Sequence, residues 1–575
     1  MSVKNQVQDR IARELKLVRR FSIEDIEHMI KSGEPEAAAH RIIFYASPAD
    51  FVSQLRTLRQ SLVNRFAHVG DELTNAYVAF LSELAVSLQS SLVSWNLANK
   101  DLHGDSIVQP AACKDEALAS LQVVEEWEAA APQVARALLV QWGQQARARF
   151  VAEGSKEPEA EADRLMGGSV GDYLRNVAQA VGCSHLRRVA EMRTAGSTQT
   201  ELGNDYAAFL KHTMYLGASF VTTNPVLVDV AWTANPGYWN PVMAKVVSQN
   251  PKAEGDDLAR LATLEVVWAN MRLLRPIFLL THGDMGCVSL QVNPKRHGEA
   301  AAMIADAQSI YAALTQRLDG NVPNVVFKLP ATLAGLEACH ALTKQGMGVN
   351  ITVNFGLFQL LRFAAAIQEG QSIFSVLSEM NGRLAYPVRD ELLARLPELA
   401  AHGIVESDVR EAAAWSGVAV VKKLQRLMRQ KGYDTSRIRP LVASLRIYKE
   451  GAGHDRLPSA YPDITEALGV AIITVFPDVR HAFDLEPRME LRGASVDEPA
   501  PEAVLRVLSH SEIFRQAYYV VDRQWVERED ERFRPLTVLA LEDVEAVAEW
   551  EPVRATLGQF GQSYDRFLGR LLSLR

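Results

Sequence analysis

The chain has 575 residues, which exceeds the size of one ordinary hydrophobic core and predicts two or more domains. Hydrophobic residues make up 48% and charged residues 23%, a globular composition that excludes global disorder. The formal net charge of −8 argues against a dedicated nucleic-acid-binding protein, although a local basic patch is still able to hold an anionic metabolite.

The chain shows no targeting or cofactor motif. Residues 1–21 are amphipathic and charged, without the apolar centre of a signal peptide, and no apolar stretch approaches the roughly 18–20 residues that cross a bilayer. The four cysteines are scattered without metal-ligand spacing, which indicates reduced thiols. The ATP, zinc and NAD motifs GxxxxGKS/T, HExxH and GxGxxG between strand and helix are absent. We therefore expect a cytoplasmic protein with no cofactor and no metal, and with neither a membrane nor nucleic acid as a partner.

Residues 1–193 are predicted to form helices. Apolar residues recur there at three- and four-residue spacing, and alternating β-branched runs are scarce. We place a domain boundary between residues 193 and 194, just before Gly196. No set of residues suited to catalysis occurs in this region, so homo-oligomerisation or packing on the second domain is favoured over a second activity. The clearest helical patterns are 51–62, 78–97 and 117–150, and the polar segment 153–163 is predicted to be a loop.

From residue 194 to 575, short apolar strands alternate with helices before a largely helical tail. Eight such strands indicate a closed parallel (β/α)8 barrel, in which functional residues collect at the carboxyl ends of the strands. An open doubly wound sheet is the alternative, but its usual nucleotide-binding turn is missing. The predicted strands are 200–204, 219–222, 287–292, 324–328, 348–352, 373–378, 441–445 and 471–475. Helical patterns between them include 257–274, 298–318, 358–367, 390–399 and 415–430.

The segment 325–332 places a lysine at the end of an apolar, β-branched run. Such a run is typical of a buried parallel strand, and a helical pattern follows it at 333–342. Burying a lysine as a cation is costly, so burial lowers its pKa and favours the neutral, nucleophilic amine. Lys328 is therefore a candidate for Schiff-base chemistry. A lysine that merely reaches solvent from the end of a strand is the alternative.

Polar side chains follow the carboxyl ends of the other predicted strands. One carboxylate, two guanidinium groups and several amides and hydroxyls would converge with the lysine, which favours an anion-holding site for carbonyl chemistry. Each residue also has a structural explanation. The carboxylate could cap a helix from Tyr206, the arginines could be surface residues, Ser444 could close a turn, and Asn350 could satisfy buried backbone. The residues are Asp205, Thr222, Asn224, Ser289, Gln291, Asn350 and Thr352, with Ser378 and Arg383 expected to end the sixth strand and Ser444 and Arg446 the seventh.

Five sequence phrases, in this order, resemble the transaldolase family, whose members are (β/α)8 enzymes of the class I aldolase superfamily. The resemblance runs from about residue 200 to the C-terminus, whereas residues 1–193 resemble nothing that we can place. It implies a role in carbohydrate metabolism, in the pentose phosphate pathway, with a sugar phosphate as the substrate. The phrases are Thr222-Thr223-Asn224-Pro225, Phe327-Lys328-Leu329-Pro330-Ala331-Thr332, Val349-Asn350-Ile351-Thr352, Ser378-Glu379-Met380-Asn381-Gly382-Arg383 and Ala443-Ser444-Leu445-Arg446.

The resemblance implies a role for each matching position. Lys328 corresponds to the Schiff-base lysine and Asp205 to the aspartate of the first strand, although the residues flanking Asp205 match loosely. Thr352 corresponds to the threonine that orients a catalytic water, and Gln291 to the catalytic position beside that water. The positions that imply substrate binding are Thr222, Asn224, Ser289, Asn350, Ser378 and Met380, and those that imply phosphate binding are Arg383, Ser444 and Arg446.

Two positions depart from the family pattern. Transaldolases carry a glutamate where this chain has Gln291, and an amide hydrogen-bonds a catalytic water without accepting its proton. Fructose-6-phosphate aldolases share the glutamine but pair it with a tyrosine at the position of Met380, where transaldolases have phenylalanine. A methionine has no such proton chemistry. The predicted site is therefore intermediate between those of the transaldolases and those of the fructose-6-phosphate aldolases. Gln291 is either a tolerated isostere or the sign of a changed balance between transfer and hydrolysis.

Three functions stay open at this point. The first is a transaldolase-like transferase that moves a dihydroxyacetone unit from a ketose phosphate to an aldehyde through a Lys328 Schiff base. The second is a lyase, similar to fructose-6-phosphate aldolase, that releases free dihydroxyacetone. The third is a sugar-phosphate-binding or scaffold protein without turnover, which the presence of both Lys328 and Asp205 disfavours.

Overall fold

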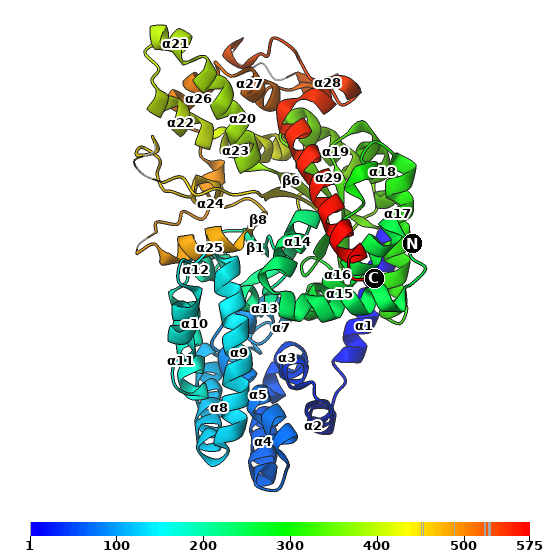
Figure 1. The fold of residues 1–575 in the computed structure, drawn as a ribbon, viewed down its shortest axis with the longest axis vertical. Helices are drawn as coiled ribbons and strands as arrows, with labels where there is room; N and C mark the ends of the chain where they lie inside the picture. Colours follow the sequence, from blue (N-terminus) through cyan, green and yellow to red (C-terminus); the bar gives the residue numbers. More distant parts are fainter. Residues whose placement is uncertain (1, 450, 452, 488, 523–524, 527–530) are drawn as a thin grey trace.

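The computed structural model describes residues 2–449, 451, 453–487, 489–522, 525–526 and 531–575. Its centre is a closed barrel of eight parallel strands, in which each strand pairs with the next and the eighth pairs with the first. The predicted (β/α)8 barrel behind a helical N-terminal region is confirmed, and the open sheet is excluded (Figure 1). The strands are β1 (Glu201–Asn204), β2 (Ala218–Thr222), β3 (Val288–Gln291), β4 (Val325–Pro330), β5 (Gly348–Asn354), β6 (Ser375–Glu379), β7 (Ile438–Val442) and β8 (Ile472–Val475).

The position predicted for the seventh strand was wrong. The apolar run 441–445 pointed to a strand there, but β7 begins earlier and includes a charged residue, Arg439. Arg439 is buried because it forms an ion pair with Glu201 of β1, with its Nη1 3.3 Å from the carboxylate Oε2. That partner comes from a distant strand, so no local pattern reveals it. Ser444 and Arg446 therefore lie in the loop after β7 and not at its end.

Helices follow the strands and cover the outside of the barrel, as the alternation of strand and helix requires. They are α13 (Leu210–Tyr215), α14 (Pro225–Ala234), α15 (Pro236–Gln249), α16 (Gly255–Leu280), η1 (Pro294–Arg296), α17 (Ala300–Arg317), α18 (Leu333–Lys344), α19 (Leu357–Glu369), α20 (Asn381–Ala394), α21 (Leu396–Leu399), η2 (Ala400–His402), α22 (Glu406–Ala414), α23 (Ser416–Gln430), α24 (Pro462–Thr465) and α25 (Pro477–Leu485). Several connections hold more than one helix, and α13, after β1, is a short one.

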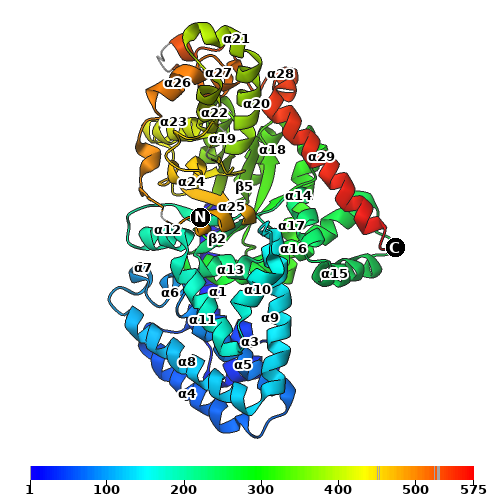
Figure 2. The same cartoon turned by 60° about the vertical axis from the view of Figure 1, so that its left-hand side comes forward.

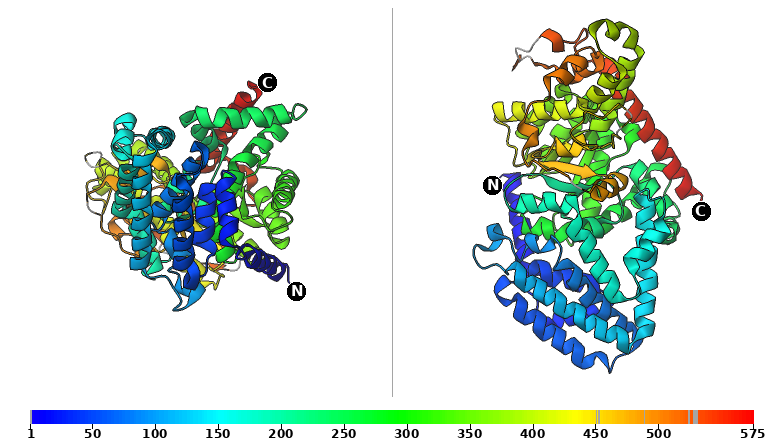
Figure 3. Two further views of the ribbon diagram at one scale, coloured as in Figure 1. Left: turned by 90° about the horizontal axis from the view of Figure 1, so that it is seen from below. Right: turned by 90° about the vertical axis from the view of Figure 1, so that its left-hand side faces the viewer.

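The N-terminal region is helical, as its apolar spacing predicted, and most of it forms a bundle below the barrel (Figure 3). The loop predicted at 153–163 was wrong in its second half, because Pro158 begins a helix and proline is favoured in a first helical turn. The long pattern 117–150 is split into two helices at Pro132. The helices are α1 (Val3–Val18), α2 (Ile23–Lys31), α3 (Pro35–Tyr45), α4 (Pro48–Phe66), α5 (Asp71–Ser87), α6 (Leu92–Trp95), α7 (Lys100–His103), α8 (Pro110–Ala130), α9 (Pro132–Ala152), α10 (Pro158–Met166), α11 (Val170–Cys183) and α12 (His185–Thr194).

The first helix, α1, docks on the barrel at the end opposite the carboxyl ends of the strands. A Cβ added at Gly346, just before β5, would meet Val3 at 2.8 Å. A Cβ added at Gly283, before β3, would lie 3.0 Å from Ile11. These close approaches place α1 across the amino ends of the strands. The domain boundary drawn between residues 193 and 194 stays a prediction.

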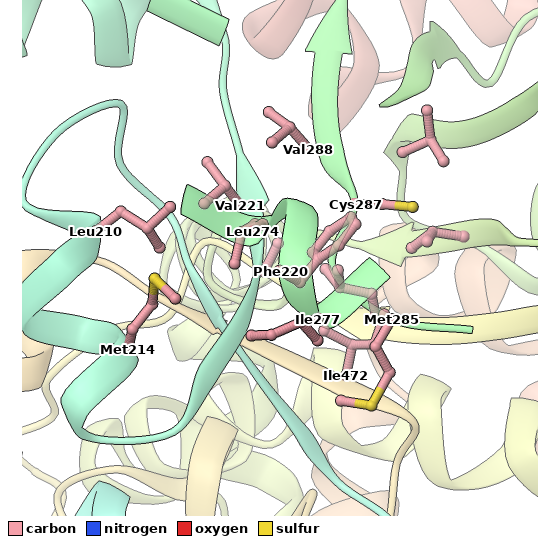
Figure 4. Packing of buried hydrophobic residues seen from close by; sticks show 14 of the residues in the cluster. Leu210, Met214, Phe220, Val221, Leu274, Ile277, Met285, Cys287, Val288 and Ile472 are labelled. Atoms are coloured by element: carbon pink, nitrogen blue, oxygen red, sulfur yellow. The ribbon is translucent and has the colours of Figure 1, made fainter. Parts of the chain in front are cut away.

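The short helix α13 is fixed by the core between the barrel and its helices. Figure 4 shows Leu210 and Met214 of α13 in one packed cluster with Phe220 of β2 and Leu274 of α16. Each of these side chains is at most 2% exposed. Because α13 follows the loop after Asp205, this packing anchors the segment that leads from that residue.

The last helix of the chain forms one wall of the carboxyl end of the barrel. The tail contains η3 (Ser495–Asp497), α26 (Glu502–Leu508), α27 (Glu512–Tyr518), an antiparallel pair β9 (Val521–Asp522) and β10 (Trp525–Val526), η4 (Glu531–Phe533), α28 (Val544–Glu549) and α29 (Glu551–Leu572). Helix α29 packs against α14, α20, η1 and β5, which end or follow strands at that end. Figures 1 and 2 show it running past α14 towards α15.

No single helix in the described ranges has both the length and the apolar character to cross a membrane, although the pair Asp71–Ser87 and Leu92–His103, bent by 79°, passes that test when taken together. The four cysteines are free thiols.

Candidate active site

Lys328 lies on β4 and is 5% exposed. Its register neighbours are Gln291 on β3 and Asn350 on β5. Burial lowers the pKa of the Lys328 amine below its ordinary value, Asp205 opposes this shift, and Arg383 adds to it. The neutral amine is the nucleophilic form of lysine. The structure therefore gives this residue the buried environment expected from the apolar run.

Asp205 follows β1 directly and is held by a chain of hydroxyls. Thr222 of β2 donates from Oγ1 to Asp205 Oδ1 at 2.6 Å, and Thr474 of β8 lies 2.9 Å from the same hydroxyl. Because Thr222 donates to the carboxylate, Thr474 is the donor to Thr222. Burial raises the pKa of Asp205, and the nearby cationic side chains lower it. The idea that Asp205 caps a helix from Tyr206 is wrong, since α13 begins further along the chain.

Three polar side chains on β3, β5 and β6 form one hydrogen-bonded row. Ser378 of β6 donates to Asn350 Oδ1 at 2.6 Å, and Asn350 Nδ2 donates to Ser289 Oγ of β3 at 2.8 Å. All three residues are at most 1% exposed. The row fixes the orientation of the Asn350 amide next to Lys328. A rigid polar group beside a reactive amine suits the binding of a substrate hydroxyl.

Two further predicted residues keep unused hydrogen-bonding capacity near the lysine. The Oε1 atom of Gln291 is buried and has no hydrogen-bond partner within the described ranges. The Thr352 hydroxyl donates to Met380 Sδ at 3.6 Å, and a thioether is a weak acceptor. Met380 follows β6 and is the N-cap residue of α20. A water or a substrate hydroxyl would therefore find available groups on both β3 and β5.

The backbone of β5 is strained beside Thr352. Val353 has a φ of 55°, which is an outlier for a β-branched residue. The register between β5 and β6 also shifts between Ile351 and Asn354. Gln359 of α19 stabilises this turn by donating to the Val353 carbonyl at 3.2 Å. Strain of this type concentrates at functional sites, where the surrounding structure holds it in place.

Two arginines form a cationic pair at the same end of the barrel. The Arg383 Nε atom is buried and has no partner in the part of the chain that the structure describes. Burial and the positive charge of Arg446 lower the pKa of Arg383 to about 10. Arg383 lies over the ring of Phe560 at 5.4 Å, and Arg446 over that of Tyr386 at 5.1 Å. Two guanidinium groups that repel each other suit a doubly charged phosphate, which would relieve the repulsion.

The arginines reach this position from different elements than predicted. Arg383 lies in the first turn of α20, past the end of β6, and Arg446 lies in the loop after β7. Gly382 lets the two elements meet, because an added Cβ would lie 2.3 Å from the Ser444 carbonyl oxygen. Ser444 has a φ of 59°, and its carbonyl accepts from Arg446 Nη1 at 3.1 Å. The loop backbone thus orients Arg446.

Asp463 was not predicted from the sequence, yet it holds this loop in place. Its Oδ2 accepts from the Arg446 backbone N–H at 3.0 Å, and its Oδ1 accepts from Asn381 Nδ2 at 3.1 Å. Burial raises the pKa of Asp463 to about 6. Burial and the charge of Asp463 also raise the pKa of Glu379 well above its usual value. Asp463 lies in a short helix after a proline, so its sequence context looks like a surface turn.

Two other residues show where sequence reasoning was incomplete. Asn224, predicted to bind substrate, caps α14, because its Oδ1 accepts from the Leu227 N–H at 2.9 Å. Its Nδ2 and the second lone pair of its Oδ1 are then left for a ligand. Phe560 was missed because nothing in the sequence connects a helix near the C-terminus with Arg383. Among the described residues, no group of three or more His, Cys, Asp or Glu side chains is arranged to hold a metal ion.

These observations define a class of protein, a closed (β/α)8 barrel with a buried lysine on its fourth strand and two arginines close to each other at the carboxyl ends of its strands. The family model described as Transaldolase/Fructose-6-phosphate aldolase matches residues 207–511, just over half of the chain. The chain belongs to this family, which confirms the resemblance of the five sequence phrases. Asp205 and the N-terminal helices lie outside the matched residues.

Individual relatives match at modest identity. The transaldolase of Arthrobacter sp. (strain FB24) is 34% identical over 152 residues, which are 26% of this chain and 38% of the relative. Transaldolase 1 of Streptomyces avermitilis is 35% identical over 137 residues, 24% of this chain and 34% of the relative. The transaldolase of Neisseria meningitidis serogroup C (strain 053442) is 32% identical over 200 residues, 31% of this chain and 53% of the relative. The chain thus spans between about a third and about a half of these curated relatives.

Proposed function

We propose that this protein is a Schiff-base enzyme that transfers a dihydroxyacetone unit from a ketose phosphate to an aldehyde. The observation that carries the proposal is the buried Lys328 amine, whose pKa is lowered by burial, beside the carboxylate of Asp205. Membership of the transaldolase and fructose-6-phosphate aldolase family supports it. A role in the pentose phosphate pathway and a cytoplasmic location belong to the same proposal.

The reaction begins when the neutral Nζ of Lys328 attacks the C2 carbonyl of the ketose. The resulting carbinolamine loses water and becomes an iminium, which accepts electrons from the C3–C4 bond. Asp205 takes the proton of the C4 hydroxyl while that bond breaks. C4 leaves as an aldehyde, and the three-carbon unit stays on Lys328 as an enamine.

The second half of the reaction reverses these steps with another aldehyde. The enamine carbon attacks the acceptor carbonyl, and Asp205 returns its proton to the new hydroxyl. Water then releases the product ketose from the iminium. The raised pKa of Asp205 suits this exchange, because a carboxyl group whose pKa lies closer to neutral pH both accepts and returns a proton more readily.

The cationic pair would position the substrate. Arg383 and Arg446 carry charges that repel each other, and a phosphate group between them would satisfy both guanidinium groups. Anchoring the phosphate end of a flexible sugar would leave its carbonyl near Lys328, so part of the barrier is met by orientation.

A second candidate is a lyase that releases free dihydroxyacetone. Gln291 favours it, because the family's transaldolases carry a glutamate there and the Gln291 Oε1 atom has no partner in the described ranges. In this reaction the enamine takes a proton at C3, and water hydrolyses the iminium without an acceptor. Product analysis of fructose 6-phosphate turnover, with and without an acceptor aldehyde, separates the two functions.

If the protein is a transferase, a new ketose should form only when the acceptor is present, and little free dihydroxyacetone should form when the acceptor is absent. The lyase predicts dihydroxyacetone at the same rate in both mixtures. A binding or scaffold protein would give neither product, and it would bind sugar phosphate equally well with Lys328 and with Lys328→Ala. That last outcome would contradict the proposal.

A further inference from the structure

A cavity of about 390 Å³ lies between the N-terminal helices and the barrel. Its walls come from α5, α9 and α11 on one side and from residues 207–212, α15 and α16 on the other. This volume is within the range of small-molecule sites, which occur preferentially at domain interfaces. Lys328, Arg383 and Arg446 do not line it, so the cavity is distinct from the candidate active site.

The charged groups beside the cavity already satisfy one another. Lys211 Nζ lies 2.8 Å from Glu36 Oε1 and 2.6 Å from Glu83 Oε2. Glu83 also lies 2.8 Å from His40 Nε2 and accepts from the Tyr215 hydroxyl. Although burial disfavours its charge, Lys211 and His40 hold the pKa of Glu83 well below its usual range. An anionic ligand would therefore find no free cation in this cluster.

The remaining polar wall is formed by an uncharged histidine and an occupied arginine. Burial and the neighbouring charge of Arg149 lower the pKa of His212 well below its usual value, so its imidazole is neutral. Arg149 lies over the ring of Phe150 at 4.4 Å, and its Nη1 lies 2.8 Å from His212 Nδ1. Its Nε is 3.9 Å from the carboxylate of Glu153. Glu153 also pairs with Arg480 at 2.7 Å, so the charges balance only when the surround of the cavity is taken together: the carboxylates of Glu36, Glu83 and Glu153 face the cations Lys211, Arg149 and Arg480.

The other walls are aromatic, with one unpartnered hydroxyl among them. The rings of Trp142 and Tyr173 stack with centroids 5.0 Å apart at 26°. Tyr238 and Trp239 form an edge-to-face pair at 4.9 Å, and Tyr238 is 52% exposed, at the rim. Ser82 is 3% exposed, and its buried Oγ has no hydrogen-bond partner in the described part of the chain. All five residues line the cavity.

We propose that this cavity binds an uncharged, planar heteroaromatic molecule of about the size of a nucleobase. Flat aromatic walls favour a planar ring through offset stacking and edge-to-face contacts. The balanced charges exclude strongly charged ligands, since a buried ion without a partner is costly. Ser82 Oγ, which has no partner among the described residues, supplies a donor and an acceptor for a hydrogen-bonding edge. This site is independent of the proposed transferase reaction.

The cavity also borders the segment that continues from Asp205. Asn204 Nδ2 donates to the carbonyls of Tyr206 and Ala208 at 2.9 and 3.2 Å. Asn270 Nδ2 donates to the Ala207 carbonyl at 3.0 Å. A ligand in the cavity would lie against this braced loop, so its binding has a local readout in the hydrogen exchange of residues 206–215.

The test uses the full chain and two neutral probes, adenine and indole, with benzoate as an anion of similar size. Tryptophan fluorescence and calorimetry should show saturable binding of both neutral probes with dissociation constants below about 1 mM. Benzoate should bind at least about tenfold more weakly. The same affinities are expected with Lys328→Met, and exchange of the segment 206–215 should slow when adenine is bound.

Two variants locate the binding. Ala79→Phe fills the cavity and should weaken both neutral probes by about tenfold or more, while Ala129→Phe adds the same ring at an exposed position of α8 and should have no effect. Ser82→Ala, which keeps the packing, should weaken adenine by about threefold to tenfold. The proposal would be overturned if adenine or indole, or both, failed to show saturable binding. Tighter binding of benzoate, or unchanged affinities in both Ala79→Phe and Ser82→Ala, would also overturn it.

Discussion

Two clusters of charged side chains lie on either side of the segment that joins β1 to α13. The pKa of the buried lysine is lowered in one cluster and raised in the other. At the carboxyl end of the barrel, burial lowers the pKa values of Lys328 and Arg383. At the interface between the N-terminal helices and the barrel, burial also disfavours the Lys211 ammonium, but Glu83 raises its pKa well above the usual value. Glu83 in turn is satisfied by hydrogen bonds and by Lys211 itself.

The difference shows that a shifted pKa has no single meaning. Where the partners are present within the protein, the shift reflects an ion pair whose loss of one member would leave a buried charge uncompensated. Where the charged groups repel each other or lose solvation without a partner, the shift reflects a site whose partner comes from outside. The first description fits the interface and the second fits the candidate active site. The following variants test that comparison.

Lys328→Met should have the largest effect. The substitution removes the nucleophile and keeps an unbranched side chain of similar length, so turnover should fall by about 10⁴-fold or more. Steady-state rates with a ketose phosphate and an acceptor aldehyde measure it. Circular dichroism should show the same folded state, because methionine preserves the packing of a long, unbranched side chain at this buried position. Turnover within tenfold of the wild type would remove Lys328 from the mechanism.

Lys211→Met is the matched variant at the interface. It leaves the buried Glu83 without its closest cation, so the free energy of unfolding should fall by about 3 kcal/mol. Urea denaturation followed by fluorescence measures the change. Turnover per folded molecule should fall far less than in Lys328→Met. If Lys211→Met left stability unchanged, the interface cluster would not be the stabilising one.

Arg446→Ala tests the phosphate-binding role proposed for the cationic pair at the barrel end. KM for a phosphorylated ketose should rise by about 100-fold, because a charged hydrogen-bonded pair with phosphate is lost. KM for an unphosphorylated ketose should change little. Arg362→Ala is the control, since Arg362 is exposed and paired with Glu542 at 2.6 Å. An equal loss for both substrates would contradict a phosphate-binding role.

Gln291→Glu should raise turnover by about tenfold, because it supplies a base for the catalytic water. The ratio of transferred to released dihydroxyacetone, measured by product analysis, should change with it. Gln291→Met is the complementary variant and should lower turnover, since a thioether binds water weakly. A Gln291→Glu variant with unchanged rate and product ratio would mean that the glutamine is a tolerated isostere.

The pH dependence of Schiff-base formation should respond to the charges around Lys328 in opposite directions. Asp205 raises the pKa of Lys328, so Asp205→Asn should lower it and move borohydride trapping to lower pH. Arg383 lowers the same pKa, so Arg383→Gln should move trapping to higher pH. Both profiles are measured with dihydroxyacetone, which forms the iminium without bond cleavage. Shifts of the same sign in both variants would show that the two charges do not control the amine.

The barrel was largely predictable because its strands carry their own signal. Short β-branched runs such as 325–329 follow from burial on both faces of a parallel strand. The position of the seventh strand was not predicted correctly, because Arg439 is buried in it only through an ion pair with Glu201, a residue on another strand. Arg383 was expected at the end of the sixth strand but lies in the first turn of α20, where Gly382 allows the close approach of the loop after β7.

The residues that support the site were much harder to predict than those that form it. Lys328 and Asp205 have chemically unusual places at strand ends, whereas Asp463 and Phe560 look like an ordinary turn and an ordinary helix face. Their contacts with Arg446 and Arg383 are set by tertiary packing. The interface cluster is equally hard to predict from the sequence, because Lys211 and Glu83 resemble solvent-facing charges on amphipathic helices.

The most direct test is borohydride reduction in the presence of dihydroxyacetone, followed by mass spectrometry of the peptides. We predict one reduced three-carbon adduct on Lys328, none on Lys211, and no adduct at all in Lys328→Met. An unlabelled Lys328, with either no adduct or one on another lysine, would contradict the claim that this buried amine forms the Schiff base.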